Sequence, residues 1–203
     1  MYDPSLVPWG EVGYAVYKRT YSRQTADGKT EEWEDTVDRV IDACRDQLNV
    51  GFTQFEEGEL KKIMMELKGT VAGRFLWQLG TKTVDRLGLP SLQNCAFVVV
   101  DDPIRPFTWA FEMLMLGSGV GFNIQRENVY QLPKVKNRVK VERIDENDAD
   151  FIVPDSREGW VELLQRVLEA SFVTGEDFTY ATHLIRSKGS AIKGFGGTAS
   201  GPE

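Results

Sequence analysis

The sequence has 203 residues, with 31 acidic and 24 basic side chains and a formal net charge of -7. This acidic balance argues against binding along a nucleic-acid backbone, which requires a basic face. No apolar run approaches the roughly 18 to 20 residues that cross a membrane, and the N-terminus lacks the basic and apolar segments of a signal peptide. Two cysteines, Cys44 and Cys95, make no disulfide framework, so we expect a cytoplasmic protein. With His183 as its single histidine, the chain offers no ordinary metal site and no Ser-His-Asp site.

The first 90 residues predict a mainly helical domain. Thr30 is expected to cap a helix, because acidic residues follow it near the positive helix end. Cys44 lies on the apolar stripe of this helix and is interpreted as a core residue. A second helix is expected to end at Gly69, and residues 74–81 predict a helical or turn segment. The stripe of the first helix consists of Trp33, Val37, Val40, Ile41, Cys44 and Leu48.

The stretch from residue 91 to residue 122 predicts one βαβ unit. Residues 92–100 are mostly apolar, which is typical of a strand buried on both faces and paired in parallel. Pro106 suits the first turn of the following helix, and Gly117 is expected to end it. Residues 120–124 then predict the second strand of the unit.

The remainder of the chain predicts a polar arm and one further helix–strand pair. Residues 126–150 are mostly polar and are expected to form an arm or hairpin outside the core. Asp155 and Glu158 have the spacing of a helix start, and residues 177–185 predict another strand. The glycine-rich end, residues 194–203, has two interpretations: a mobile terminus or a ligand loop. Altogether the pattern predicts an α/β protein whose first strand needs neighbours on both sides, so the sheet looks unfinished.

Cys95 is the most informative residue of the predicted βαβ unit. A lone cysteine on a strand is usually a small hydrophobic residue, and this interpretation is favoured on local grounds. One interpretation of the glycines at 117, 119 and 121 is that they serve only tight turns and close packing. They follow a helix instead of opening one, so they are not the dinucleotide-binding motif. The functional alternative is that these glycines let the backbone approach a ligand beside Cys95.

Several segments, taken in order, resemble one family, the adenosylcobalamin-dependent ribonucleotide reductases, and within it the monomeric type that reduces triphosphates. The similar segments cover nearly the whole chain. They are Trp9-Gly10 through Arg19-Thr-Tyr-Ser-Arg23, Trp33 to Val37, Leu76-Trp77 to Gly80-Thr81, Asn94-Cys95, Gly117 to Phe122, Pro154 to Trp160 and Gly194 to Pro202.

The resemblance implies a ten-stranded α/β barrel, of which this chain would supply a helical N-terminal domain, residues 1–90, and the first strands and helices, residues 91–203. It also implies thiyl-radical chemistry that depends on adenosylcobalamin, bound mainly outside this chain. Cys95 matches the family cysteine on the first barrel strand. That cysteine helps to protonate the departing 2′-hydroxyl and then forms a disulfide with a second cysteine further along.

The resemblance further implies roles for seven other residues and for three partners. Thr81 would contact the phosphates of a ribonucleotide substrate, Asn94 would lie beside the ribose, and Gly119 would let the backbone approach the sugar. A deoxynucleotide effector and a thioredoxin-like reductant are the other expected partners. The effector region would include Asp102, Ile104, Lys193 and Gly194.

The sequence stops at Glu203, where members of this family continue for several hundred residues. The radical cysteine and the disulfide partner of Cys95 would therefore lie elsewhere. We hypothesise a split or interrupted reductase, active only with a second chain that completes the barrel. The rival hypothesis is a non-catalytic relic or regulatory module that retains nucleotide or subunit binding. An independent phosphate-binding enzyme is disfavoured, because no base, nucleophile and oxyanion site can be named.

Overall fold

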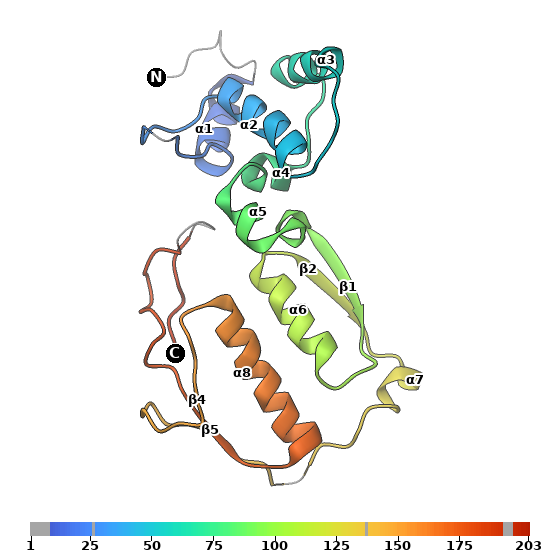
Figure 1. Ribbon diagram of the computed structural model, residues 1–203, viewed down its shortest axis with the longest axis vertical. Coiled ribbons are helices and arrows are strands. Elements are labelled where there is room, and N and C mark those ends of the chain that lie inside the picture. Colours follow the sequence, from blue (N-terminus) through green and yellow to red (C-terminus); the bar gives the residue numbers. More distant parts are fainter. Residues whose placement is uncertain (1–8, 26, 137, 193–196) are drawn as a thin grey trace. The chain divides into compact units, whose positions relative to one another are not determined.

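The computed structural model describes residues 9–25, 27–136, 138–192 and 197–203. Internal contacts divide the chain into two compact units, Met1–Gln93 and Asn94–Glu203 (Figure 1). The first unit is helical, and the second combines helices with two small parallel sheets, which confirms the α/β class. Among the described residues, no helix is long and apolar enough to cross a membrane.

The first unit is built around its second helix. Trp33, Val37 and Val40 of this helix are almost completely buried, so the predicted stripe does form the core. Cys44 is partly buried against the same cluster, as expected for a core thiol. The helices of this unit are α1 (Gly10–Thr20), α2 (Trp33–Asp46), α3 (Gln54–Met65), α4 (Gly73–Gln78) and α5 (Lys82–Leu87), and a 3-10 turn, η1 (Leu89–Leu92), follows.

The start of α2 differs from the prediction. Thr30 does not cap the helix, because it pairs with Gln24 in an antiparallel bridge. The cap is Glu32, whose backbone N–H donates to the carboxylate of Asp35 at 2.9 Å. Glu31, one of the acidic residues that follow Thr30, is buried.

The second unit opens with the predicted βαβ arrangement. Strands β1 (Cys95–Val99) and β2 (Gly119–Asn123) pair in parallel, and α6 (Arg105–Met115) connects them and packs on both. Pro106 occupies the first turn of α6, as predicted. Gly117 follows the end of α6 with φ +80°, a left-handed conformation that glycine adopts without steric cost.

The prediction that β1 is buried on both faces is wrong for this chain. Cys95, Phe97 and Val99 are exposed and alternate with the half-buried Ala96 and Val98. Phe97 is 63% exposed. Within the described residues, β1 pairs with β2 along one edge, and α6 packs on this pair, so the alternation marks one covered and one open face.

The second sheet corrects the expectation for residues 126–150. A short helix, α7 (Arg126–Val129), is followed by β3 (Val141–Arg143), which pairs in parallel with β5 (Phe178–Ala181) instead of folding back as a hairpin. Strand β4 (Phe151–Ile152) pairs with the other edge of β5, which gives the order β3-β5-β4. Strand β5 lies within the strand predicted at 177–185.

Helix α8 (Arg157–Glu169) packs beside α6, as Figure 1 shows, and continues into a π-helical turn, η2 (Ala170–Thr174). The predicted start at Asp155 is wrong by one residue. Ser156 is the cap, because its side chain accepts the Gly159 N–H at 3.0 Å. Asp155 instead forms an ion pair with Arg186 at 2.9 Å.

Candidate functional site

Cys95, Asn94 and Gly119 lie together where β1 and β2 begin. Cys95 and Gly119 are Cα partners in the parallel pair, and the Gly119 N–H donates to the Asn94 carbonyl at 2.8 Å. The structure therefore brings together three of the residues that the sequence singled out, from segments 24 residues apart (119 − 95).

The space beside Gly119 is open. A Cβ placed there would meet no atom closer than the Asn94 carbonyl oxygen, at 3.8 Å. By contrast, a Cβ at Gly121 would come within 3.0 Å of the Phe97 ring. Cys95 is itself exposed, and its partner on the neighbouring strand, Gly119, carries no side chain.

Asp102 and Ile104 lie at the start of α6. The Asp102 carboxylate accepts the backbone N–H groups of Ile104 at 2.8 Å and Arg105 at 2.7 Å. These hydrogen bonds, that from Arg105 above all, hold the pKa of Asp102 below its usual range. Asp102 thus holds the backbone at the start of α6, where Ile104 is the N-cap residue. Lys193 and Gly194, predicted with it for an effector, lie outside the described residues.

Thr81, the remaining predicted contact, belongs to the first unit, where it caps α5. Its hydroxyl donates to the Gln78 carbonyl at 2.7 Å and accepts the Thr83 N–H at 3.3 Å. A phosphate oxygen is an acceptor, so a hydrogen bond to it from Thr81 requires this hydroxyl hydrogen to leave Gln78.

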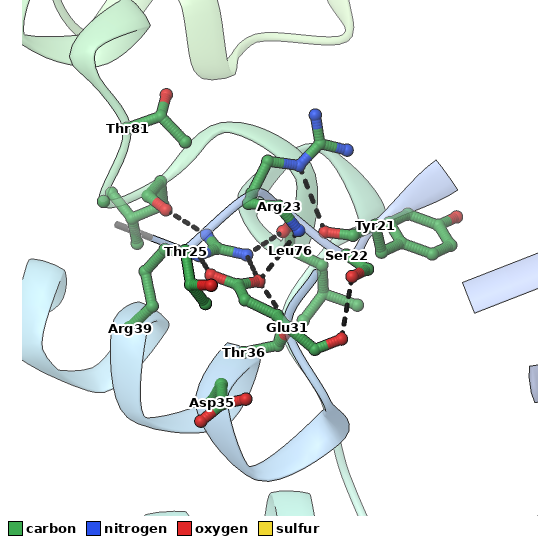
Figure 2. A network of polar contacts seen from close by, with 12 residues as sticks. Tyr21, Ser22, Arg23, Thr25, Glu31, Asp35, Thr36, Arg39, Leu76 and Thr81 are labelled. Carbon is green, nitrogen blue, oxygen red and sulfur yellow. Dashed lines mark hydrogen bonds and ion pairs between the residues drawn. The ribbon is translucent and has the colours of Figure 1, made fainter. Parts of the chain in front are cut away.

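A buried ion pair underlies the turn that carries Thr81. Figure 2 shows Arg39 and Glu31 at the centre of a polar network. The Arg39 guanidinium donates to both oxygens of the Glu31 carboxylate, at 2.6 and 3.0 Å, and to the carbonyls of Leu76 and Leu79. Thr36 also donates to the carboxylate, at 2.8 Å. Every partner of this charge pair is thus supplied within the first unit.

Burial alone would raise the pKa of Glu31, since it disfavours the charged form. The hydrogen bonds and the positive charge of Arg39 outweigh this effect, with further help from Thr36 and from the backbone N–H of Arg23, and the pKa of Glu31 is lowered. Arg23 in turn has its pKa lowered by burial and by the nearby charge of Arg39. Glu31 therefore remains a carboxylate at neutral pH.

Gln47, at the end of α2, also holds the Thr81 turn. Its side-chain oxygen accepts the Gly80 N–H at 2.8 Å, and its side-chain nitrogen donates to Asp85 at 2.7 Å. The sequence alone does not identify Glu31, Arg39 and Gln47 as parts of this network. No local pattern marks them, because their partners lie as many as 40 positions away along the chain.

Among the described residues, no group of three or more His, Cys, Asp and Glu side chains could hold a metal ion. His183, the single histidine, is exposed.

Two family models match the chain. The model of the ribonucleotide reductase alpha domain matches residues 2–81, and that of the B12-dependent ribonucleotide reductase insertion domain matches residues 126–203. The second match concerns a segment that the sequence analysis treated as a continuation of the barrel.

Similar proteins include adenosylcobalamin-dependent ribonucleoside-triphosphate reductases. The chain is 35% identical to that of Lactobacillus leichmannii over 96% of its length, and 32% identical to that of Euglena gracilis over 98%. A protein named a probable reductase of this kind, from Dictyostelium discoideum, is 34% identical over 96%. The chain covers 34%, 30% and 29% of these relatives, or about a third of their length.

The fold agrees with the sequence comparison. A crystal structure of a B12-dependent, class II ribonucleotide reductase matches 97% of this chain with a TM-score of 0.78 at 29% identity. The match covers 35% of that solved chain. Since two family models, the named relatives and the solved structure agree, this chain belongs to the B12-dependent ribonucleotide reductases and corresponds to an N-terminal part of them.

Proposed function

We propose that this chain forms the N-terminal third of an adenosylcobalamin-dependent ribonucleoside-triphosphate reductase, in which Cys95 is one of two thiols that reduce the ribose. It would act together with the remaining two thirds of the enzyme, carried by the same polypeptide or by a second one. The observation that carries the proposal is the exposed Cys95 thiol beside the open space at Gly119.

The proposed reaction replaces the 2′-hydroxyl of the ribose by hydrogen. The C2′–O bond breaks, a C2′–H bond forms, and the hydroxyl leaves as water. Two thiols supply two hydrogens and two electrons and end as one disulfide, so atoms and electrons balance. The Cys95 Sγ–H would give its proton to the departing hydroxyl and would then bond to a second cysteine outside this chain. A thioredoxin-like dithiol would restore the thiols.

Adenosylcobalamin, when bound, would supply the radical that starts the reaction. As in the resemblance, we assign the cobalamin mainly to the other two thirds of the enzyme. The chain's own part would be to present the thiol and to bind the nucleotide.

Three residues would contact the substrate. Asn94 and Gly119 border Cys95, which supports contacts with the ribose. Thr81 would meet the phosphates through its hydroxyl. A deoxynucleotide effector would be bound near Asp102, Ile104, Lys193 and Gly194. The Asp102 carboxylate would act indirectly in this role, since it already accepts the N–H groups of Ile104 and Arg105.

The ten-stranded barrel is also part of the proposal. The β1–β2 pair would be its beginning, with further strands added at the free edge of β1 and over the open face that carries Phe97 and Val99. An apolar parallel strand with one free edge and one open face needs such cover, since parallel sheets are normally buried on both faces.

The test is a pair of cysteine substitutions in the enzyme assembled with its remaining two thirds. Cys95→Ser should abolish adenosylcobalamin-dependent formation of deoxynucleotides while nucleotide binding persists. Cys44→Ser is the matched control: Cys44 is half-buried against the helical core, and its variant should retain turnover. Full turnover by Cys95→Ser would disprove the proposal, and an assembly that binds nucleotide but is inactive with both cysteines intact would favour the non-catalytic module.

A further inference from the structure

The turn Leu79–Thr81 between α4 and α5 depends on a glycine. Gly80 has φ +79°, and a Cβ at this position would come within 2.5 Å of the Arg39 Cγ. Within the turn, the Thr81 N–H donates to the Gln78 carbonyl at 3.1 Å. Because glycine can adopt many backbone conformations, bonds from neighbouring residues help to keep this turn in one geometry.

Arg39 fixes the side of the turn that faces α4. Its guanidinium donates to the Leu76 carbonyl at 2.9 Å and to the Leu79 carbonyl, while the Glu31 carboxylate holds the other edge of the planar group. Because the guanidinium is planar, the hydrogen bonds to Glu31 at one edge also fix the direction of its remaining N–H groups. The end of α4 and the first residue of the turn are thus tied to α2 (Figure 2).

Gln47 fixes the side that faces α5. Its side-chain oxygen accepts the Gly80 N–H at 2.8 Å. Its side-chain nitrogen donates to the Thr81 carbonyl at 3.4 Å and to the Asp85 carboxylate at 2.7 Å. Gln47 is half-buried and lies one residue beyond α2. Removing its amide would leave the core unchanged and would free the turn.

We propose that Gln47 and Arg39 are positioning residues for the Thr81 turn, and that through it they set the affinity of the enzyme for the polyphosphate of a ribonucleoside triphosphate. This inference rests on the proposed function, in which Thr81 contacts those phosphates. Neither side chain needs to touch the nucleotide. Both act by keeping the Thr81 hydroxyl where a phosphate oxygen can replace the Gln78 carbonyl as its acceptor.

The central variant is Gln47→Met, which keeps the size of the side chain and removes the amide. In the assembled reductase, its KM for a ribonucleoside triphosphate should rise about five- to tenfold, the effect of one or two lost hydrogen bonds, while kcat stays near that of the parent. Gln54→Met is the matched control, because Gln54 is exposed on α3 and should leave both constants unchanged.

The dissociation constants of one nucleoside and its mono-, di- and triphosphate give the decisive readout. The effect of Gln47→Met should be absent for the bare nucleoside and should appear with the phosphates. A general loss of structure would weaken all four ligands alike. Arg39→Lys keeps the charge but loses the planar fork, and it should show the same dependence on phosphate.

The outcomes separate this inference from the proposed function. If Thr81→Asp weakens triphosphate binding and Gln47→Met does not, the positioning role is disproved and the phosphate contact stands. If Thr81→Asp binds the triphosphate as tightly as the parent, the phosphate contact fails, and this inference fails with it. Equal weakening of nucleoside and triphosphate by Gln47→Met would also contradict it.

Discussion

Cys95 and Gly119 are Cα partners in the parallel β1–β2 pair, and a Cβ at Gly119 would meet nothing closer than 3.8 Å. Gly119 has no left-handed conformation to protect, and packing does not exclude a methyl group there. A Cβ at this position is thus compatible with the sheet. In the proposed function the glycine has another role, which is to leave room for an approaching ligand.

Gly119→Ala tests this explanation directly. The variant should unfold at the same temperature as the parent or slightly higher, because alanine restricts the unfolded chain. Its kcat/KM in the assembled reductase should fall about 100-fold, since a displaced ribose loses its reactive geometry. Thermal unfolding and steady-state kinetics measure the two effects. Gly51→Ala is the control, with open space around its Cβ and no activity change expected. Undiminished activity of Gly119→Ala would contradict a sugar contact.

Thr81 combines a structural and a proposed binding role, and three substitutions separate them. Thr81→Ser keeps both roles and should bind a ribonucleoside triphosphate normally. Thr81→Asp keeps a good helix cap but cannot donate and repels phosphate, so binding should weaken at least tenfold with little loss of stability. Thr81→Val removes the cap as well, at a cost of about 1 kcal/mol in unfolding free energy. Calorimetric titration and denaturant unfolding check the series. Equal binding by the Ser and Asp variants would disprove the phosphate contact.

The contrast between α2 and its surroundings shows what the sequence alone could establish. The spacing of Trp33, Val37 and Val40 is a local property, so the buried stripe was predictable. The βαβ unit was predictable for the same reason, from two apolar runs with Pro106 and Gly117 between them. The partners of Glu31 were not predictable, because Arg39 is oriented by the carbonyls of Leu76 and Leu79, which lie far along the chain. The open face of β1 was not predictable either. An apolar run indicates that a strand needs to be buried, but it does not show whether residues 1–203 supply the elements that bury it.

Gly80 and Gly28 allow a comparison of alanine substitutions at two left-handed positions, one crowded and one open. Both have positive φ, +79° and +81°, but a Cβ at Gly80 would lie 2.5 Å from the Arg39 Cγ, whereas none of the described atoms lies within 4 Å at Gly28. Gly28→Ala should lower the free energy of unfolding by about 1 kcal/mol, the cost of the left-handed conformation. Gly80→Ala should cost roughly 2 to 4 kcal/mol, because Arg39 must also shift. Denaturant unfolding gives both values. Equal losses would mean that Arg39 moves without cost and does not fix the turn.

The buried Glu31 carboxylate should make the stability of the helical unit sensitive to acid. Its pKa is below the reference value of 4.5 in the folded chain, with Arg39 as the main stabilising partner against the opposing effect of burial. A lowered folded pKa means that the unfolded chain binds the proton more readily. The contribution of Glu31 is therefore fully present above about pH 4.5 and is lost as the pH falls through the lower, folded value.

Glu31→Gln removes this titration and leaves Arg39 without its counter-charge. At pH 7 the variant should be less stable by about 3 to 5 kcal/mol, the usual cost of breaking a buried ion pair. The difference in unfolding free energy between parent and variant should shrink below pH 4.5. The parent then loses the stabilisation by the charged Glu31 carboxylate, which the variant lacks at every pH. Glu34→Gln is the control, as Glu34 is exposed in the first turn of α2, the helix that follows Glu31. Unfolding free energies of parent and variant at pH 7, 5, 4 and 3 measure the trend. A constant difference across this range would contradict a lowered pKa of Glu31 in the folded chain.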